Sequence, residues 1–216
     1  MNTARISLTL DIRSYWLHAR GEGGGADFDL VMERDNDGLP VLRGRHLAGL
    51  LRLALERAVA WRWLTDEYIA LDVPGLLMGS RGEGAPGCLD IRSARIARPL
   101  HDRLTADKAL REACFQRLST TAIDGRLGVA KEKHLRSIEA ALPLPLVFSV
   151  GFDPFDRMAW AGGNEVDTRH VTIAASTWHD WIRTAWPALD EVGAKRTRGF
   201  GRLGMTEPVF SSGEVP

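Results

Sequence analysis

The sequence predicts a single α+β domain built on a βαββαβ core. Three features carry this prediction: a strictly alternating apolar and polar segment near the start of the chain, two segments with apolar residues at helical spacing, and short apolar segments between and after them. A chain of 216 residues suits one compact domain with its own core and leaves little room for a second.

The first half of the chain supplies a strand, a helix and a second strand. "RISLTLDIR" at 5–13 alternates apolar and polar residues with the period of a half-buried strand. Residues 21–40 are glycine-rich at their start and predict a long exposed loop. Residues 45–63 repeat leucine and alanine at helical spacing, and after the glycine-rich break at 76–87 the segment 88–96 has the pattern of a second strand.

The second half supplies a strand, a helix and a strand. "LTADKALREACFQRL" at 104–118, with a capping signal at Thr105, predicts a polar, peripheral helix. The short apolar segment 144–152 predicts a central strand. Ser176 is a good N-cap for a helix with a tryptophan stripe, which we interpret as core or subunit packing, and 200–210 resumes an extended pattern.

This order is the ferredoxin-like (RRM-like) βαββαβ arrangement, in which both helices cover one face of an antiparallel sheet. RNA-recognition domains often bind through the face that remains free. Fold alone does not give function, so the loops must be considered.

Composition describes an ordinary cytoplasmic protein. The 28 basic and 28 acidic residues balance, so any site for a polyanion must be local. Cys88 and Cys114 lie in no metal-ligand or redox spacing. No segment reaches the roughly 20 apolar residues needed to cross a bilayer, and the N-terminus has no secretory h-region, so we expect no membrane partner.

The sequence "GAKRTRGFGRL" at 193–203 concentrates positive charge among glycines. Glycines let backbone amides approach a ligand, and interleaved arginines can grip phosphate oxygens, so this loop could cradle a phosphate. An equally good interpretation is a solvated hairpin whose glycines only satisfy turn geometry. The cations of this loop are Lys195, Arg196, Arg198 and Arg202.

Four segments, in order, resemble the RAMP superfamily, the repeat-associated proteins of CRISPR effector complexes. The loop "VGAKRTRGFGRLG" is similar to the family's glycine-rich C-terminal loop. "LHARGEGGG" (17–25) resembles its L-H-x-G-x-G segment, and "DLVMERDNDGLPVLRGRHLAGLLR" (29–52) resembles its D-L-P-V-x-R-D signature. "TAIDGRLGVAKEKHLRSIEAALPLPLVF" (121–148) is similar to its I-D-R-x-T-G region.

Within the superfamily the chain most resembles the backbone subunit of type III, Csm- or Cmr-like, effector complexes. The resemblance implies one RAMP domain over residues 1–216 with a thumb hairpin inserted at about 119–140. It also implies that the subunit binds CRISPR RNA and target RNA, and that it joins other copies of itself and other Cas subunits.

The resemblance further implies cleavage of target RNA by a loop aspartate with Mg²⁺ or another divalent cation. The matching residue is Asp29, as both metal ligand and catalytic group, and Asp27 is its rival. Without the resemblance, both would be interpreted as ordinary solvated acids.

RNA contacts are implied at positions on the matched motifs. In the 43–49 segment this chain departs from the family, with arginine in place of proline and arginine and histidine in place of serines. The thumb departs too, with Gly125 where the family has arginine. The implied contacts are His18, Arg43, Arg45, His46, Arg52, Arg126, Lys131 and Lys133, together with the cations of the C-terminal loop.

Three alternatives stay open from the sequence. The chain could be a RAMP subunit that only binds RNA or caps the complex. It could be a metal-independent endoribonuclease that processes precursor RNA through His18. It could also be a protein-interaction module, which would show no salt-dependent affinity for RNA.

Overall fold

The computed structural model describes residues 5–19, 28–82, 84–121, 126, 127, 129 and 136–204. The Lys131, Lys133 and Asp27 side chains and the segment 205–210 lie outside these ranges. The elements in chain order are β1 (Arg5–Leu10), α1 (Gly44–Ala60), α2 (Asp66–Ala70), α3 (Val73–Met78), β2 (Leu89–Ile91), β3 (Arg95–Ile96), α4 (Leu100–Ala106), α5 (Lys108–Glu112), β4 (Phe115–Thr120), β5 (Arg136–Ala141), β6 (Leu146–Phe152), α6 (Phe155–Ala161), α7 (Glu165–Ala185), and the 3-10 turns η1 (Trp186–Ala188) and η2 (Arg196–Arg198).

The main sheet is centred on β6, as the apolar segment predicts. β1 pairs with one edge of β6, and β2 and β3 pair with the other, all antiparallel. Leu8 lies opposite Phe148, and Leu10 lies opposite Leu146, so both strands present their large apolar side chains to the same face. These side chains are fully buried, which confirms the half-buried strand predicted at the N-terminus.

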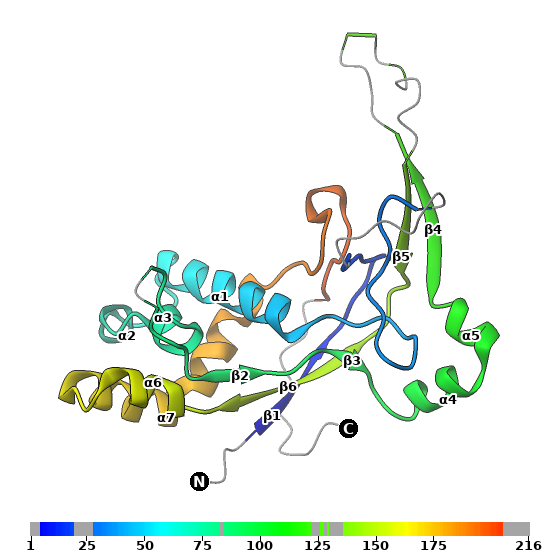
Figure 1. The fold of residues 1–216 in the computed structure, drawn as a ribbon. Coiled ribbons are helices and arrows are strands. Elements are labelled where there is room, and N and C mark those ends of the chain that lie inside the picture. Colours follow the sequence, from blue (N-terminus) through cyan, green and yellow to red (C-terminus); the bar gives the residue numbers. More distant parts are fainter. Residues whose placement is uncertain are drawn as a thin grey trace.

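α1 and α7 pack on each other and against this face of the sheet (Figure 1). The Trp178 ring of α7 stacks on Phe152 of β6, and Trp186, just after α7, stacks on Phe148, each with ring centroids 6.4 Å apart. The tryptophan stripe is therefore core packing. The fold is a mixed α+β fold with antiparallel sheets, as predicted.

The prediction of a helix at 104–118 is wrong for the second half of that segment. α5 ends at Glu112, and Phe115 begins strand β4 instead. The cap is also displaced: the Asp107 carboxylate accepts hydrogen bonds from the amides of Ala109 and Leu110, whereas Thr105 lies inside α4 and donates to the His101 carbonyl. Residues 115–120 form a strand because they pair with β5, and the local pattern of apolar residues does not reveal such pairing.

The predicted start of the second core helix, at Ser176, is also wrong. α7 begins at Glu165, where the Asn164 side chain accepts a hydrogen bond from the Val166 amide. Ser176 lies in mid-helix and donates to the Ile173 carbonyl. The polar first half of α7 is partly exposed, so it lacks the apolar stripe by which a helix is recognised.

The segment 88–96 is interrupted as a strand, and only residues 200–204 of the last predicted strand fall among the described residues. Residues 88–96 form β2 and β3 with a break between them. Of the final predicted strand, the described part forms only isolated antiparallel bridges, at Arg202 with Glu191 and at Leu203 with Ile12.

β4 and β5 form a separate two-stranded antiparallel ribbon that projects from the body (Figure 1). Its base is joined to the body by a parallel bridge between Leu30 and Ile138 and by an antiparallel bridge between Trp16 and Ala141. The Trp16 indole nitrogen also donates to the Leu142 carbonyl at 3.0 Å. Across the described parts of the chain, no helix has the length and apolar character to cross a bilayer.

Candidate nucleic-acid interface

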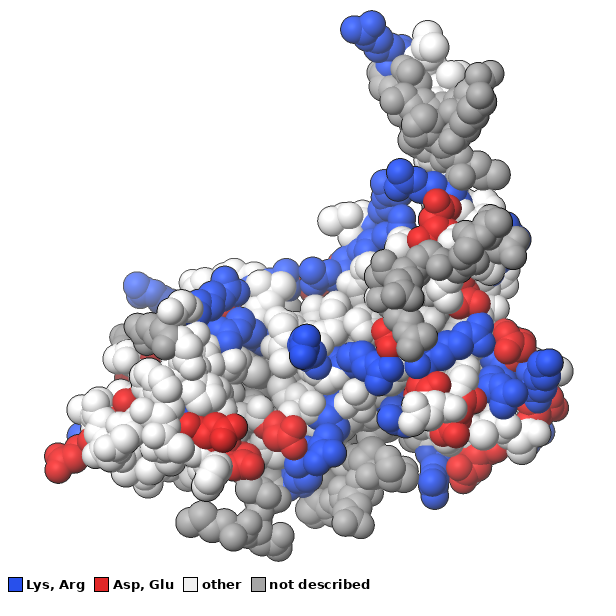
Figure 2. Space-filling model, viewed as in Figure 1, with Lys and Arg blue, Asp and Glu red and all other residues white. Residues whose placement is uncertain are grey.

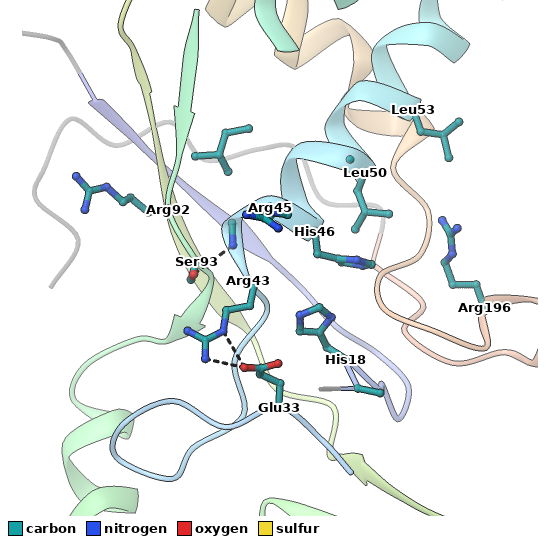
Figure 3. A pocket seen from close by; sticks show the side chains of 14 residues that line it. His18, Glu33, Arg43, Arg45, His46, Leu50, Leu53, Arg92, Ser93 and Arg196 are labelled. Carbon is teal, nitrogen blue, oxygen red and sulfur yellow. Dashed lines mark hydrogen bonds and ion pairs between the residues drawn. The ribbon is translucent and has the colours of Figure 1, made fainter. Parts of the chain in front are cut away.

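A hollow of about 930 Å³ opens at the N-terminal end of α1 (Figure 3). Its lining is cationic and comes from segments far apart in the sequence. Arg43 and Arg45 come from the start of α1, Arg92 from the edge between β2 and β3, and Arg196 from the C-terminal loop. The structure therefore brings together two of the cationic segments that the sequence singles out.

The start of α1 fits tightly against the sheet edge. Gly44 lies so close to the Ile91 carbonyl that a Cβ would clash with it, and the Gly44 amide donates to Ser93 Oγ at 3.1 Å. The first turn of α1 carries no acidic residue. The Gly44 and His46 amides are already paired, with Ser93 Oγ and the Arg43 carbonyl, so this end of α1 attracts an anion through the partial positive charge of the helix N-terminus.

The glycines of the C-terminal loop serve its packing. Gly193 and Gly201 have positive φ angles, and a Cβ on either would clash with the backbone of Leu17 or Val192. The Ala194 amide donates to the Leu17 carbonyl at 2.7 Å. Turn geometry and close approach thus account for these glycines without a ligand.

Only one of the four loop cations faces the hollow. Arg196 lines it, whereas Lys195, Arg198 and Arg202 are not among its lining residues. Within the part of the chain that the structure describes, the side chains of Arg45 and Arg196 make no hydrogen bond or ion pair. Both guanidinium groups are therefore available to a ligand.

Two histidines lie side by side at the hollow. The His18 and His46 ring centroids are 4.8 Å apart, and His46 Nε2 accepts a hydrogen bond from the Gly193 amide. Burial, with smaller contributions from His18 and Arg196, lowers the pKa of His46 to about 4. Burial also lowers the pKa of His18, although Glu33 opposes the shift. Both rings are neutral at pH 7 and add no charge to the site.

Glu33 is the acidic member of the lining. Its carboxylate accepts hydrogen bonds from Arg43 Nε at 3.0 Å and Nη2 at 2.6 Å, and its side chain is only 12% exposed. Arg43 is therefore held in place by Glu33 and is partly neutralised.

Figure 2 shows a row of Lys and Arg side chains across the face between the helices and the β4–β5 ribbon, with acidic side chains among them near the base of the ribbon and others at the lower left. The overall neutral chain thus concentrates positive charge locally, which is the arrangement that a polyanion site in such a chain requires.

Arg52 and Arg126 lie away from the hollow. The Arg52 guanidinium donates to the carbonyl oxygens of Met78 and Gly79, at 2.5 and 2.6 Å, and so satisfies the C-terminal end of α3. Arg126 is described in the segment between β4 and β5 and is exposed. Neither residue is among those that line the hollow.

Asp29 lies at the base of the ribbon. Its amide donates to the Ser137 carbonyl and its Oδ2 accepts from the Ser137 amide, both at 2.8 Å. Asp29 is exposed and does not line the hollow. The described residues place no group of metal-ligating side chains around it.

The group that could hold a metal ion lies elsewhere. Asp35, Asp37 and His101 place one ligand atom each within 4.8 Å of one another. Sequence reasoning missed this group, although the Asp-x-Asp spacing in "RDND" is a signal for it. It also missed Arg92 and Glu33, because only the folded chain places the edge of the sheet beside α1.

Comparisons with known proteins agree with this architecture. The family profile of the RAMP superfamily matches residues 9–204. Two chains of type III-B Cmr-beta complexes have a similar fold. One, from a complex bound to cognate target RNA, has a TM-score of 0.61 at 10% identity and covers 95% of this chain and 96% of its own. The other, from the apo state, has a TM-score of 0.60 at 12% identity, with the same coverage. No curated protein matches the sequence.

Proposed function

The chain belongs to the RAMP superfamily, and on this premise we propose that it is an RNA-binding backbone subunit of a cytoplasmic type III, Cmr-like, CRISPR effector complex. In this proposal the hollow at the N-terminal end of α1 receives the ribose-phosphate backbone of the CRISPR RNA. The Cmr-beta chain of similar fold belongs to a complex that binds target RNA, which supports the assignment.

One observation carries the proposal: Arg45 and Arg196, more than 100 residues apart in the sequence, line the same hollow beside a helix N-terminus. Arginine binds phosphate oxygens through its planar fork, and the helix N-terminus adds a partial positive charge. Because these groups recognise phosphate rather than base edges, binding is electrostatic and independent of base sequence.

The β4–β5 ribbon is the thumb in this proposal. It projects from the body, and its two strands enclose most of the segment 119–140 in which the thumb is expected. A projecting hairpin could be pushed between guide and target strands, and copies of the subunit would join head to tail along the guide. Other Cas subunits would contact the ends of such a row.

We further propose that Asp29 serves target cleavage with a divalent cation. Mg²⁺ is commonly held by one or two carboxylates together with substrate phosphates, so a single aspartate at the base of the thumb fits such a site. When bound, the ion would stabilise the charge that develops on the scissile phosphate. The hydrogen bond from the Ser137 amide fixes the Asp29 carboxylate at the ribbon.

RNA binding is tested with the full chain and a labelled single-stranded RNA over a range of salt concentrations. The expected result is an affinity that falls steeply with salt and is the same for unrelated base sequences. If the chain does not bind RNA at low salt, the proposal is refuted, and the protein-interaction module becomes the favoured alternative.

Cleavage is tested after assembly on a guide, with a complementary target and Mg²⁺. Asp29→Asn keeps the acceptor for Ser137 but removes the charge, so we expect normal RNA binding and no cleavage. Unchanged cleavage would remove Asp29 from the reaction, and a wild type that binds but does not cut would make the chain a non-catalytic subunit. If RNA cleavage continues in the presence of EDTA and is lost in His18→Ala, the chain is instead the metal-independent endoribonuclease.

A further inference from the structure

We propose that Asp35, Asp37 and His101 form a binding site for a divalent transition-metal ion that fastens the loop after residue 34 to α4. His101 Nε2 lies 3.4 Å from Asp37 Oδ2 and 4.0 Å from Asp35 Oδ2. The two aspartates and the histidine come from segments separated by more than 60 residues, so folding is needed to assemble the three ligands.

One buried carboxylate oxygen of the cluster receives no hydrogen bond. The Asp35 side chain is 1% exposed, and its Oδ2 has no hydrogen-bond donor in the described structure. Its other oxygen, Oδ1, accepts from the amides of Asp37 and Leu39, at 3.0 and 2.9 Å. A buried carboxylate oxygen without a hydrogen-bond donor is costly, and a cation between Asp35 and His101 would coordinate it.

The groups around the cluster leave room for a positive charge. Arg95 Nη1 is 3.7 Å from Asp35 Oδ2, beyond hydrogen-bond distance, and offsets only one of the two carboxylate charges. Asp102 Oδ1 lies 3.4 Å from His101 Nδ1. A proton on Nδ1 shared with Asp102 leaves the Nε2 lone pair directed at the two aspartates, which is how metal-bound histidines are usually oriented.

The ligand set selects the kind of ion. One imidazole nitrogen with two carboxylate oxygens suits Zn²⁺ and similar borderline ions better than Mg²⁺, which prefers oxygen ligands alone. The ion would brace the base of the ribbon, because neighbouring Arg34 pairs with Glu112 and with Glu139 of β5. This site is independent of the proposed RNA function.

The test uses the full chain without an affinity tag and without RNA, after treatment with a chelator. Zn²⁺, Mn²⁺ and Mg²⁺ are added separately, and binding is measured by calorimetry and by the shift in Tm. We expect one Zn²⁺ per chain and a higher Tm, with Mg²⁺ binding much more weakly. Asp37→Asn and His101→Gln should each weaken Zn²⁺ binding by about tenfold or more.

Asp180→Asn and His170→Gln are the matched controls, because each removes the same kind of group from α7. Their Zn²⁺ affinity should equal that of the wild type. The proposal is overturned if Zn²⁺ does not bind, if the site variants bind it as tightly as the controls, or if Mg²⁺ binds as tightly as Zn²⁺. Asp35 is left unchanged because its Oδ1 holds the loop.

Discussion

His46 Nε2 accepts a hydrogen bond of 3.1 Å from the Gly193 amide, and this bond ties the start of α1 to the C-terminal loop. Since Nε2 is the acceptor, the ring must be neutral, with its proton on Nδ1. Arg45 lies one residue before His46 and Arg196 three residues after Gly193, so the bond joins the two segments that supply these arginines of the hollow.

Stability should fall in mild acid because of this histidine. Folding lowers the pKa of His46 from 6.5 to about 4, so the unfolded chain binds the proton first. The contribution of His46 is therefore complete above pH 6.5 and is lost as the pH falls toward 4. Denaturant unfolding at several pH values measures it: the gap in unfolding free energy between wild type and His46→Asn should narrow as the pH falls. A difference in unfolding free energy that does not change with pH would contradict the lowered pKa of His46.

Removing the arginines of the hollow should weaken RNA binding without changing its sequence preference. Arg45→Ala and Arg196→Ala should each lower the slope of log affinity against log salt by about 0.7 if each contacts one phosphate. Filter binding over a salt series gives the slope. Arg81→Ala removes an arginine that pairs with Glu56, away from the hollow, and is the control. Equal slopes in all variants would place the RNA elsewhere.

Neutralising Glu33 should strengthen RNA binding. Glu33 is the acid of the hollow and holds Arg43, so Glu33→Gln removes a repulsive charge and leaves Arg43 in place. At separations of several ångströms in a hydrated site, the gain is about threefold at low salt and disappears at high salt. Glu56→Gln, which breaks an ion pair farther along α1, should have no effect. A weaker affinity in Glu33→Gln would mean that holding Arg43 outweighs the charge.

Asp29 should stabilise the base of the ribbon whatever its chemical role. Asp29→Ala removes the acceptor for the Ser137 amide, at a cost of about 1 kcal/mol in unfolding free energy, whereas Asp29→Asn keeps an acceptor. Hydrogen exchange at the Ser137 amide reports this directly and should speed up only in the alanine variant. Equal exchange in both variants would show that the bond does not protect this amide.

The sequence predicts elements whose own periodicity matches their burial. β1, α1 and β6 are of this kind, because each has apolar residues on the face that the fold buries. β4 is not: its residues alternate weakly, and pairing with β5 makes the strand. The first half of α7 is not either: it is partly exposed, and its start is marked by the Asn164 cap and the acidic residues Glu165 and Asp167 rather than by an apolar stripe.

The candidate site is predictable in its residue types but not in its assembly. The sequence singles out His18, Arg43, Arg45, His46 and Arg196, all of which line the hollow. The sequence also groups Arg196 with three loop cations that do not line the hollow. The direction of each of these side chains depends on contacts of the loop with residues 15–17. Such long-range contacts leave no local pattern in the chain.

The β4–β5 ribbon meets the body at the Leu30–Ile138 bridge, close to the residue that holds Arg43. Leu30 stands three residues before Glu33 in the same segment, and the Met32 amide within it donates to Glu139 Oε2 of β5. We therefore expect a displacement of the ribbon to be transmitted along this segment to Glu33 and, through its ion pair, to Arg43 at the hollow.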